Sequence, residues 1–254
     1  MGLLFQNIQP KVAKLVKNKK PIDGQKVNPE YLDTVRLLSK NVKVANQQAQ
    51  RAMLQKIANS VQLDDGELVI FGTDRNGETN KSQKIALHKD DDGKWVLPIR
   101  PLISGGDDVT FVCDGRIALD LAVTFLNAFE DATRDILGEQ LDPLGLEKLT
   151  ACAGIAIVKT HYPFARAYAL ADELAGEAKQ LVNTDAYLHN RDQEGKPVIR
   201  YSALDWHYIT GGIYDDLDEM RKRAEAAKMS WKYDTVTRQS MVNSLTLSQD
   251  EVQK

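Results

Sequence analysis

The stretch "RPLISGGDDVTFVC" constrains the fold of this chain more than any other, because it predicts two strands joined by a tight acidic turn. Apolar residues stand on both sides of two glycines and two aspartates, which is the pattern of a strand, a turn and a second strand. An isolated two-stranded hairpin is only marginally stable in water, so the elements around it decide the fold class.

Helical patterns lie on both sides of the hairpin. Residues 28–63 begin with an Asn-Pro pair typical of a helix start and repeat apolar residues at helical spacing. Asp114 caps a second helix over 115–138, and an apolar run at 148–159 predicts a buried strand before a helix at 163–182. We also expect strands at 67–72, 84–89, 94–103 and 198–209, and a charged helix at 215–228. This alternation predicts an α+β fold, a sheet with helices on one face.

Bulk composition limits the location and the partners. The 254 residues are 43% hydrophobic and 27% charged, as in soluble globular proteins. The net charge of -3 does not indicate direct nucleic-acid binding, so any site for a polyanion has to be local. No apolar run is long enough for a membrane, and the first residues do not form a secretory signal. Cys113 and Cys152 stand in apolar runs, so we expect small core residues in a reducing cytoplasm.

The acidic turn itself indicates chemistry. Gly105 and Gly106 allow a sharp turn and the close approach of a ligand, because no Cβ is in the way. Asp107 and Asp108 repel each other unless they share a cation. Mg²⁺ is commonly bound by a few carboxylates together with water and substrate phosphates. We therefore interpret the turn as a candidate site for Mg²⁺ (or Mn²⁺) and a nucleoside triphosphate, although plain hairpins also contain such turns.

Other polar features favour structural roles. The run of three acids at 90–92 stands next to Gly93 and is typical of a solvated hairpin tip. His161 and His207 have no second histidine or cysteine at metal-ligand spacing, so we expect packing or hydrogen bonding from them. The sequence contains no P-loop, no GxSxG motif and no HExxH motif.

Three separated motifs, "LPIRPLISGGDDVTFVCDGRIALDLA", "CAGIAIVKTHYPFARAYALADELAGEAK" and "SALDWHYI", resemble one known family. They are similar to the palm polymerase domain of the large subunit of type III CRISPR effector complexes, a relative of the GGDEF nucleotide cyclases. The resemblance implies a ferredoxin-like palm, with an antiparallel sheet and helices on one face. We expect an N-terminal helical part of the palm at 1–66, a palm core at 67–182 and a C-terminal extension at 183–254.

The resemblance also implies an activity. Such a palm uses ATP, or another nucleoside triphosphate, and Mg²⁺ to make cyclic or linear oligonucleotide messengers in antiviral defence. Carried over by position, Asp107 and Asp108 are the catalytic, metal-binding acids, and Gly105 and Gly106 let the nucleotide lie against the backbone. Lys179 matches a lysine that contacts the triphosphate in related cyclases. A solvated lysine near a helix C-terminus is the alternative for Lys179, and both readings stay open. A phosphate contact is also conceivable for Lys159 at the end of the 148–159 strand, but we expect a solvated strand-end lysine there.

A diguanylate cyclase is the nearest enzymatic alternative, and two features argue against it: Asp108 is followed by Val109, and Arg100 does not start an Arg-x-x-Asp motif. The sequence departs from the palm family at its start and at its end, where "SWKYDTVTRQSMVNSLTL" only loosely resembles the family's ending. The family carries a further acid on a first strand, and "MGLLFQNI" resembles the segment just after that strand, so we expect this strand to be missing. We therefore expect a homo-oligomer, or a partner chain that supplies the strand. A catalytically silent palm that binds nucleotide or protein as a scaffold is the alternative to a nucleotidyltransferase.

Overall fold

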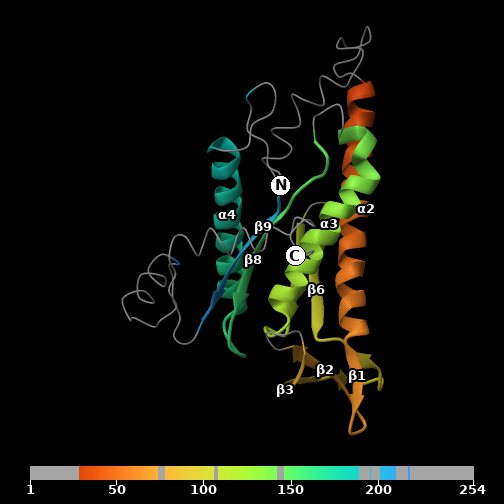
Figure 1. Cartoon of the computed structure of the whole chain (residues 1–254), viewed down its shortest axis with the longest axis vertical. Coiled ribbons are helices and arrows are strands. Elements are labelled where there is room, and N and C mark those ends of the chain that lie inside the picture. Colours follow the sequence, from red (N-terminus) through yellow and green to blue (C-terminus); the bar gives the residue numbers. More distant parts are fainter. Residues whose placement is uncertain are drawn as a thin grey trace. The chain divides into compact units, whose positions relative to one another are not determined.

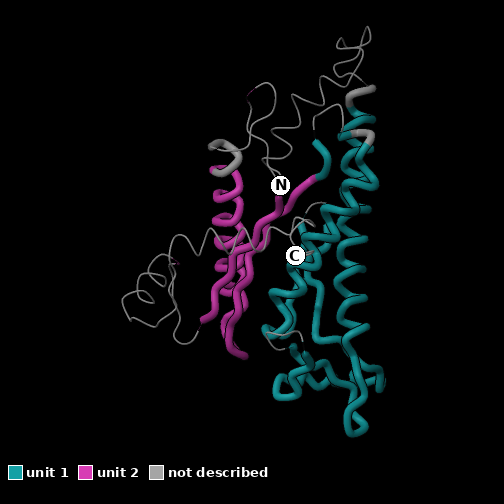
Figure 2. Tube along the Cα trace, in the orientation of Figure 1, with its two compact units in different colours: residues 1–148 teal, residues 149–254 magenta. Residues whose placement is uncertain are grey.

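The computed structural model describes residues 29–73, 78–105, 108–141, 146–188 and 201–209, together with Gly195 and Leu217. Helices and mainly antiparallel strands make up an α+β fold, consistent with a ferredoxin-like palm, as the sequence predicts. Figure 2 shows the two compact units of the chain, residues 1–148 and residues 149–254. None of the helices in the described ranges is both long enough and apolar enough to cross a bilayer.

Two long helices, α2 (Pro29–Asn59) and α3 (Ala118–Leu141), lie side by side in the first unit (Figure 1). Helix α2 begins at Pro29, where the Asn-Pro pair predicts its start. Ala45 and Ala49 on the buried face of α2 have no exposed surface. Small residues at these positions let a neighbouring helix approach closely.

A three-stranded antiparallel sheet follows α2, formed by β1 (Val61–Asp64), β2 (Glu67–Thr73) and β3 (Thr79–Ala86). The sequence pattern extended the helix to residue 63, but α2 ends at Asn59 because the next residues pair with β2. Asp65 and Gly66 form the turn between β1 and β2 with φ angles of 49° and 81°. Two successive positive φ angles are the mark of a type I′ hairpin turn.

The acidic run at 90–92 is confirmed as a hairpin tip. It joins β4 (His88–Lys89) to β5 (Trp95–Val96), which pair antiparallel. The Asp90 carboxylate accepts hydrogen bonds from the backbone N–H groups of Asp92 (3.1 Å) and Lys94 (2.8 Å). Asp90 therefore stabilises the turn through these two hydrogen bonds.

The hairpin predicted from "RPLISGGDDVTFVC" is present as β6 (Ile99–Gly105) and β7 (Asp108–Cys113), paired antiparallel. One face of the hairpin packs on a core that α2, α3 and the three-stranded sheet share. The buried side chains of this core are Met53, Ile57, Ile70, Ile85, Leu87 and Leu121, and Ile99, Phe111 and Cys113 pack against them.

The second unit contains a strand, a helix and a strand: β8 (Cys152–Ile157), α4 (Phe164–Leu188) and β9 (Ala203–Tyr208). β8 and β9 are parallel, as a helical connection between paired strands allows. Helix α4 packs so close to β8 that a Cβ on Gly154 would lie 1.9 Å from the carbonyl oxygen of Ala171. β8 is half-buried along its length. Apart from Leu217, the charged helix predicted at 215–228 lies outside the described residues.

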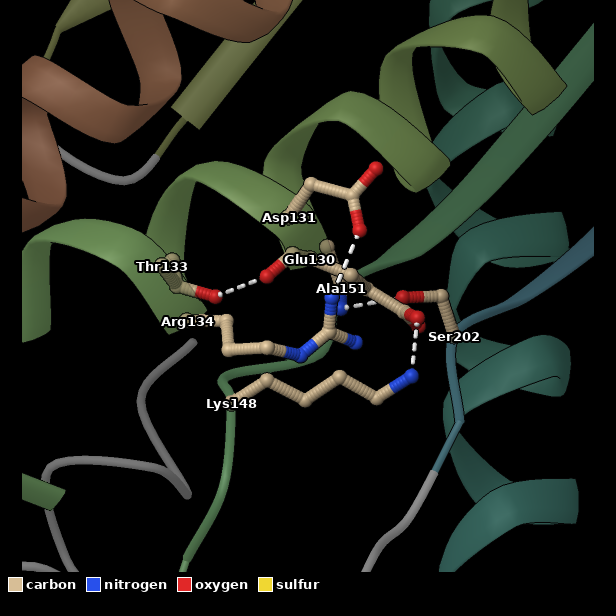
Figure 3. A network of polar contacts seen from close by, with 7 residues as sticks. All are labelled: Glu130, Asp131, Thr133, Arg134, Lys148, Ala151 and Ser202. Atoms are coloured by element: carbon tan, nitrogen blue, oxygen red, sulfur yellow. Dashed lines mark hydrogen bonds and ion pairs between the residues drawn. The ribbon is translucent and has the colours of Figure 1, made fainter. Parts of the chain in front are cut away.

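A polar network at the end of the first unit is structural. Figure 3 shows the Lys148 ammonium group paired with the Glu130 carboxylate, and both side chains are largely buried. The Thr133 hydroxyl donates to the Glu130 carbonyl oxygen (2.9 Å). A second pair, Arg134 with Asp131 (2.8 Å), is about half exposed and follows helical spacing. The Lys148 pair ties the segment after α3 to that helix.

Candidate functional site at the acidic hairpin

The end of the β6–β7 hairpin carries the predicted site residues. Gly105 and Asp108 face each other as the last pair of the ladder. Gly106 and Asp107, the other two predicted residues, lie outside the described residues. The structure therefore places Gly105 beside Asp108.

Residues of β7 alternate between the core and an open face. Phe111 and Cys113 pack into the core, so Asp108, Thr110 and Val112 lie on the opposite face. Two hydrogen bonds fix the end of β6 on α2, because the side chains of Gln50 and Ser104 donate to each other (2.9 and 3.1 Å). Ser104 precedes Gly105, so α2 directly supports the acidic end of the hairpin.

The open face of the hairpin contains residues that the sequence motif did not single out. Ile103 pairs with Thr110, and Arg100 pairs with Val112, so all four share the face of Asp108. Ile103 and Val112 are 44% and 48% exposed, which is high for apolar side chains. The face extends about 13 Å from Asp108 to Val112, the residue that pairs with Arg100, because each of the four residue steps along β7 rises about 3.3 Å. It thus has Asp108 at one end, Ile103 and Thr110 in the middle, and Val112 with Arg100 at the other end.

Gly105 leaves open space beside Asp108. Its φ angle is not positive, so the backbone does not require a glycine there. A Cβ built on Gly105 would meet no atom within 4 Å, so packing does not require a glycine either. The missing side chain keeps the surface beside the carboxylate clear for a ligand.

The base of the hairpin is held by an aspartate–arginine pair. The Arg116 guanidinium donates to both carboxylate oxygens of Asp114 (2.9 and 2.7 Å), which holds the pKa of Asp114 below its usual value. The same guanidinium donates to the carbonyl oxygen of Lys84 in β3 (2.7 Å). Asp114 also accepts from the Arg116 backbone N–H, a turn that precedes α3. This pair connects the hairpin, the sheet and the start of α3.

Both cysteines have packing roles. Cys113 and Cys152 are free thiols and half-buried. Burial raises the pKa of Cys113 to about 12 and also raises the pKa of Cys152. Thiols of this kind are poor nucleophiles at neutral pH.

Lys179 is half-buried in α4, in the second unit of the chain. The helix continues to Leu188, nine residues further, so the alternative reading of Lys179 as a helix C-terminal lysine is wrong. Lys159 is exposed, as expected. His161 is also exposed, with a φ angle of 69°, so it does not pack in the core, whereas His207 is half-buried in β9.

The described carboxylate fits a hard cation. Asp108 is exposed and makes no hydrogen bond or ion pair with the other described residues. An uncommitted carboxylate beside open space is the kind of ligand that Mg²⁺ takes together with water and phosphate oxygens. Within the described ranges, no group of three or more histidine, cysteine, aspartate or glutamate side chains is placed to hold a metal ion.

These features define a palm-type α+β domain with an exposed acidic hairpin. A family model described as Cas10/Cmr2, second palm domain, matches residues 36–188, which is more than half of the chain. The chain belongs to this family, which confirms the resemblance seen in the sequence. The matched residues include the hairpin, α3, β8 and α4. A search of curated proteins finds no similar sequence.

Proposed function

We propose that this chain is a Mg²⁺-dependent nucleotidyltransferase of the palm polymerase type. It converts ATP, or another nucleoside triphosphate, to cyclic or linear oligonucleotides that act as messengers in antiviral defence in the cytoplasm. The observation that carries the proposal is Asp108, an exposed and uncommitted carboxylate beside the open space at Gly105. Because the chain belongs to the second palm family, we interpret this carboxylate as a ligand of the metal ion that accompanies the nucleotide.

The open face of the hairpin suits a nucleotide. Asp108, with Asp107 next to it in the sequence, is proposed to hold the metal ion at the triphosphate. Gly105 and Gly106 are proposed to admit the phosphates close to the backbone. The exposed apolar side chains of Ile103 and Val112 offer a surface for the base. When bound, Mg²⁺ supplies activation of the attacking hydroxyl and charge neutralisation at the phosphates.

The proposed reaction joins two nucleotides. The 3′-hydroxyl oxygen of one nucleotide forms a bond to the α-phosphorus of another and loses its proton to solvent. The bond from that phosphorus to the bridging oxygen breaks, and pyrophosphate leaves. Repetition gives a linear product, and attack within one product gives a cyclic one.

The site calls for more ligands than the hairpin supplies. The strands "IRPLISG" and "DVTFVC" contain no acid besides Asp108. Among the described residues, the hairpin β6–β7 forms a two-stranded sheet. We extend the proposal to a further acidic strand, from a second copy or a partner chain, that pairs with an edge of this hairpin. Light scattering would then detect an oligomer or a complex, whereas a monomer that turns over ATP unaided would refute this extension.

Calorimetric titration with ATP tests the proposed site. Asp108→Asn should lower Mg²⁺-dependent ATP affinity at least tenfold, while the melting temperature without metal stays unchanged or rises because like-charge repulsion is relieved. Gly105→Ala should also weaken ATP binding, because its methyl group enters the open space, but should not lower stability. Asp92→Asn makes the same charge change at the tip of β4–β5 and is the control. Equal affinity in the wild type and the Asp108→Asn variant would remove the basis of the proposal.

A catalytically silent palm is the second candidate function. It is favoured by the absence of a further acid on either hairpin strand. In that case ATP would bind with the same dependence on Asp108, but no linked nucleotide would form with any partner or metal ion. Binding and product assays together therefore separate the two candidates.

A further inference from the structure

The positive charge of this chain is concentrated at its N-terminal end. Residues 1–60 contain eleven lysines and arginines against three acids, although the whole chain has a net charge of -3. Within α2 the residues from Thr34 to Asn59 include five cations and no acid. Such asymmetry is typical of chains that bind nucleic acid or a membrane surface.

Five side chains form one line along the exposed side of α2, here called the basic stripe. They recur at spacings of three or four residues and so share one face of the helix. All five are exposed or half-exposed, and they extend over about 22 Å at the rise of an α-helix. The members are Arg36, Lys40, Lys43, Gln47 and Arg51.

The charges of the stripe are poorly compensated. Lys40, Lys43 and Arg51 make no ion pair or hydrogen bond with any other described residue. Arg36 pairs with Asp33 at 3.3 Å, but both side chains are more than 70% exposed, so the pair contributes little. Lys56 of the same helix, in contrast, pairs with Asp120 of α3 at 2.6 Å. Like charges three and four residues apart destabilise a helix slightly, and a bound anion relieves this.

A membrane surface does not fit the stripe. A helix that lies on a bilayer inserts its own apolar face among the lipids. The apolar face of α2 is already buried within the first unit, through Leu38, Val42, Ala45, Ala49 and Met53. A linear polyanion needs only the exposed cations.

We propose that the basic stripe binds the phosphodiester backbone of a single-stranded nucleic acid. The cations lie in a single line, which suits one strand. The stripe contains no aromatic side chain on which bases could stack, so binding should show little sequence preference. Gln50 borders the stripe and contacts Ser104 at the acidic hairpin, so the bound strand lies along the helix that supports that hairpin. The inference does not depend on nucleotidyl transfer.

Fluorescence anisotropy of the full chain with a labelled oligouridylate of about 16 nucleotides, the upper end of usual site sizes, tests the proposal. The stripe variant removes three charges, and a matched control variant removes three exposed charges elsewhere in the first unit. The stripe variant should bind at least tenfold more weakly. For this variant the slope of log affinity against log salt should become shallower by about 2, because each of the three lost phosphate contacts accounts for about 0.7. The control should bind like the wild type. The stripe variant carries Lys40→Gln, Lys43→Gln and Arg51→Gln. The control variant carries Lys81→Gln, Lys89→Gln and Lys94→Gln.

Several results would overturn the proposal. These are no binding by the wild type, equal losses in both variants, or equally tight capture of polyglutamate or anionic vesicles by the stripe. If circular dichroism shows that the stripe variant does not fold, ultraviolet crosslinking of the wild type to the oligouridylate decides. Crosslinked peptides from residues 36–51 support the site, and crosslinks confined to other regions refute it.

Discussion

Alanine substitutions of two glycines in the second unit should have opposite effects on stability. A Cβ on Gly154 would lie 1.9 Å from the carbonyl oxygen of Ala171 and 2.4 Å from the backbone nitrogen of Ala175. Both contacts are to backbone, so no side chain can rotate away. Helix α4 would have to retreat by about 1 Å or more to reach ordinary contact distance. Gly176, exposed in the same helix, has nothing within 4 Å of a Cβ.

The magnitudes follow from these geometries. The retreat of α4 loosens the packing of Leu170, Leu174, Ala178 and Val182, which are all buried. Overpacking of this kind destabilises by about 1–3 kcal/mol, and the backbone contacts place Gly154→Ala at about 3 kcal/mol. Gly176→Ala should stabilise by about 1 kcal/mol, since alanine is the better helix former.

Hydrogen exchange measured by mass spectrometry reports on this unit directly. Peptides from β8 and α4 of Gly154→Ala should lose about two orders of magnitude of protection. A loss of about 3 kcal/mol in stability gives this factor, since about 1.4 kcal/mol corresponds to tenfold. The same peptides of Gly176→Ala should be protected as well as or better than the wild type. If Gly154→Ala keeps wild-type protection, α4 does not pack on β8 as closely as the structure shows, and the reasoning fails.

Two further predictions concern the first unit. Lys148→Met leaves the Glu130 carboxylate without its ammonium partner and should lower stability by about 3 kcal/mol, whereas Arg134→Met, in the exposed pair with Asp131, should lower it by less than about 1 kcal/mol. Urea denaturation measures both, and equal small losses would show that the Lys148 pair is not effectively buried. The Cys113 thiol has a pKa of about 12 in the fold against 9.0 in its absence, so alkylation at pH 8 should spare it until urea unfolds the chain. The free energy of unfolding should also fall as the pH rises from about 9 toward 12, because only the unfolded thiol ionises. Native Cys113 that alkylates as fast as free cysteine would contradict this.

Local sequence signals identified the hairpin and most helices. The Asn-Pro pair marks the start of α2, and the two glycines with two aspartates mark the end of β6–β7, because both are set by short-range backbone preferences. The Asp65-Gly66 turn is an equally local signal of a type I′ hairpin, and it places the end of the helix before β1.

Features that depend on residues far apart in the sequence could not be predicted from local patterns. The parallel pairing of β8 with β9 joins residues about fifty positions apart, and no local pattern specifies its register. The alternation of β7 could be read from the sequence, but only the packing of Phe111 and Cys113 on α2 and α3 shows that Asp108 faces outward. The contact between Gln50 and Ser104 crosses 54 positions and has no signature in either segment. The sequence pattern ended the second-unit helix at residue 182, close to Lys179, whereas α4 continues to Leu188 and places Lys179 well inside the helix.

Product analysis after incubation with ATP and Mg²⁺ tests the central claim most directly. We predict that mass spectrometry detects pyrophosphate and linked adenylates from the wild-type chain, together with any strand-bearing partner, and none from Asp108→Asn under the same conditions. The Asp92→Asn control should form product at the wild-type rate. No linked product from any common nucleoside triphosphate with Mg²⁺ or Mn²⁺, or equal product from Asp108→Asn, would contradict a nucleotidyltransferase centred on the acidic hairpin.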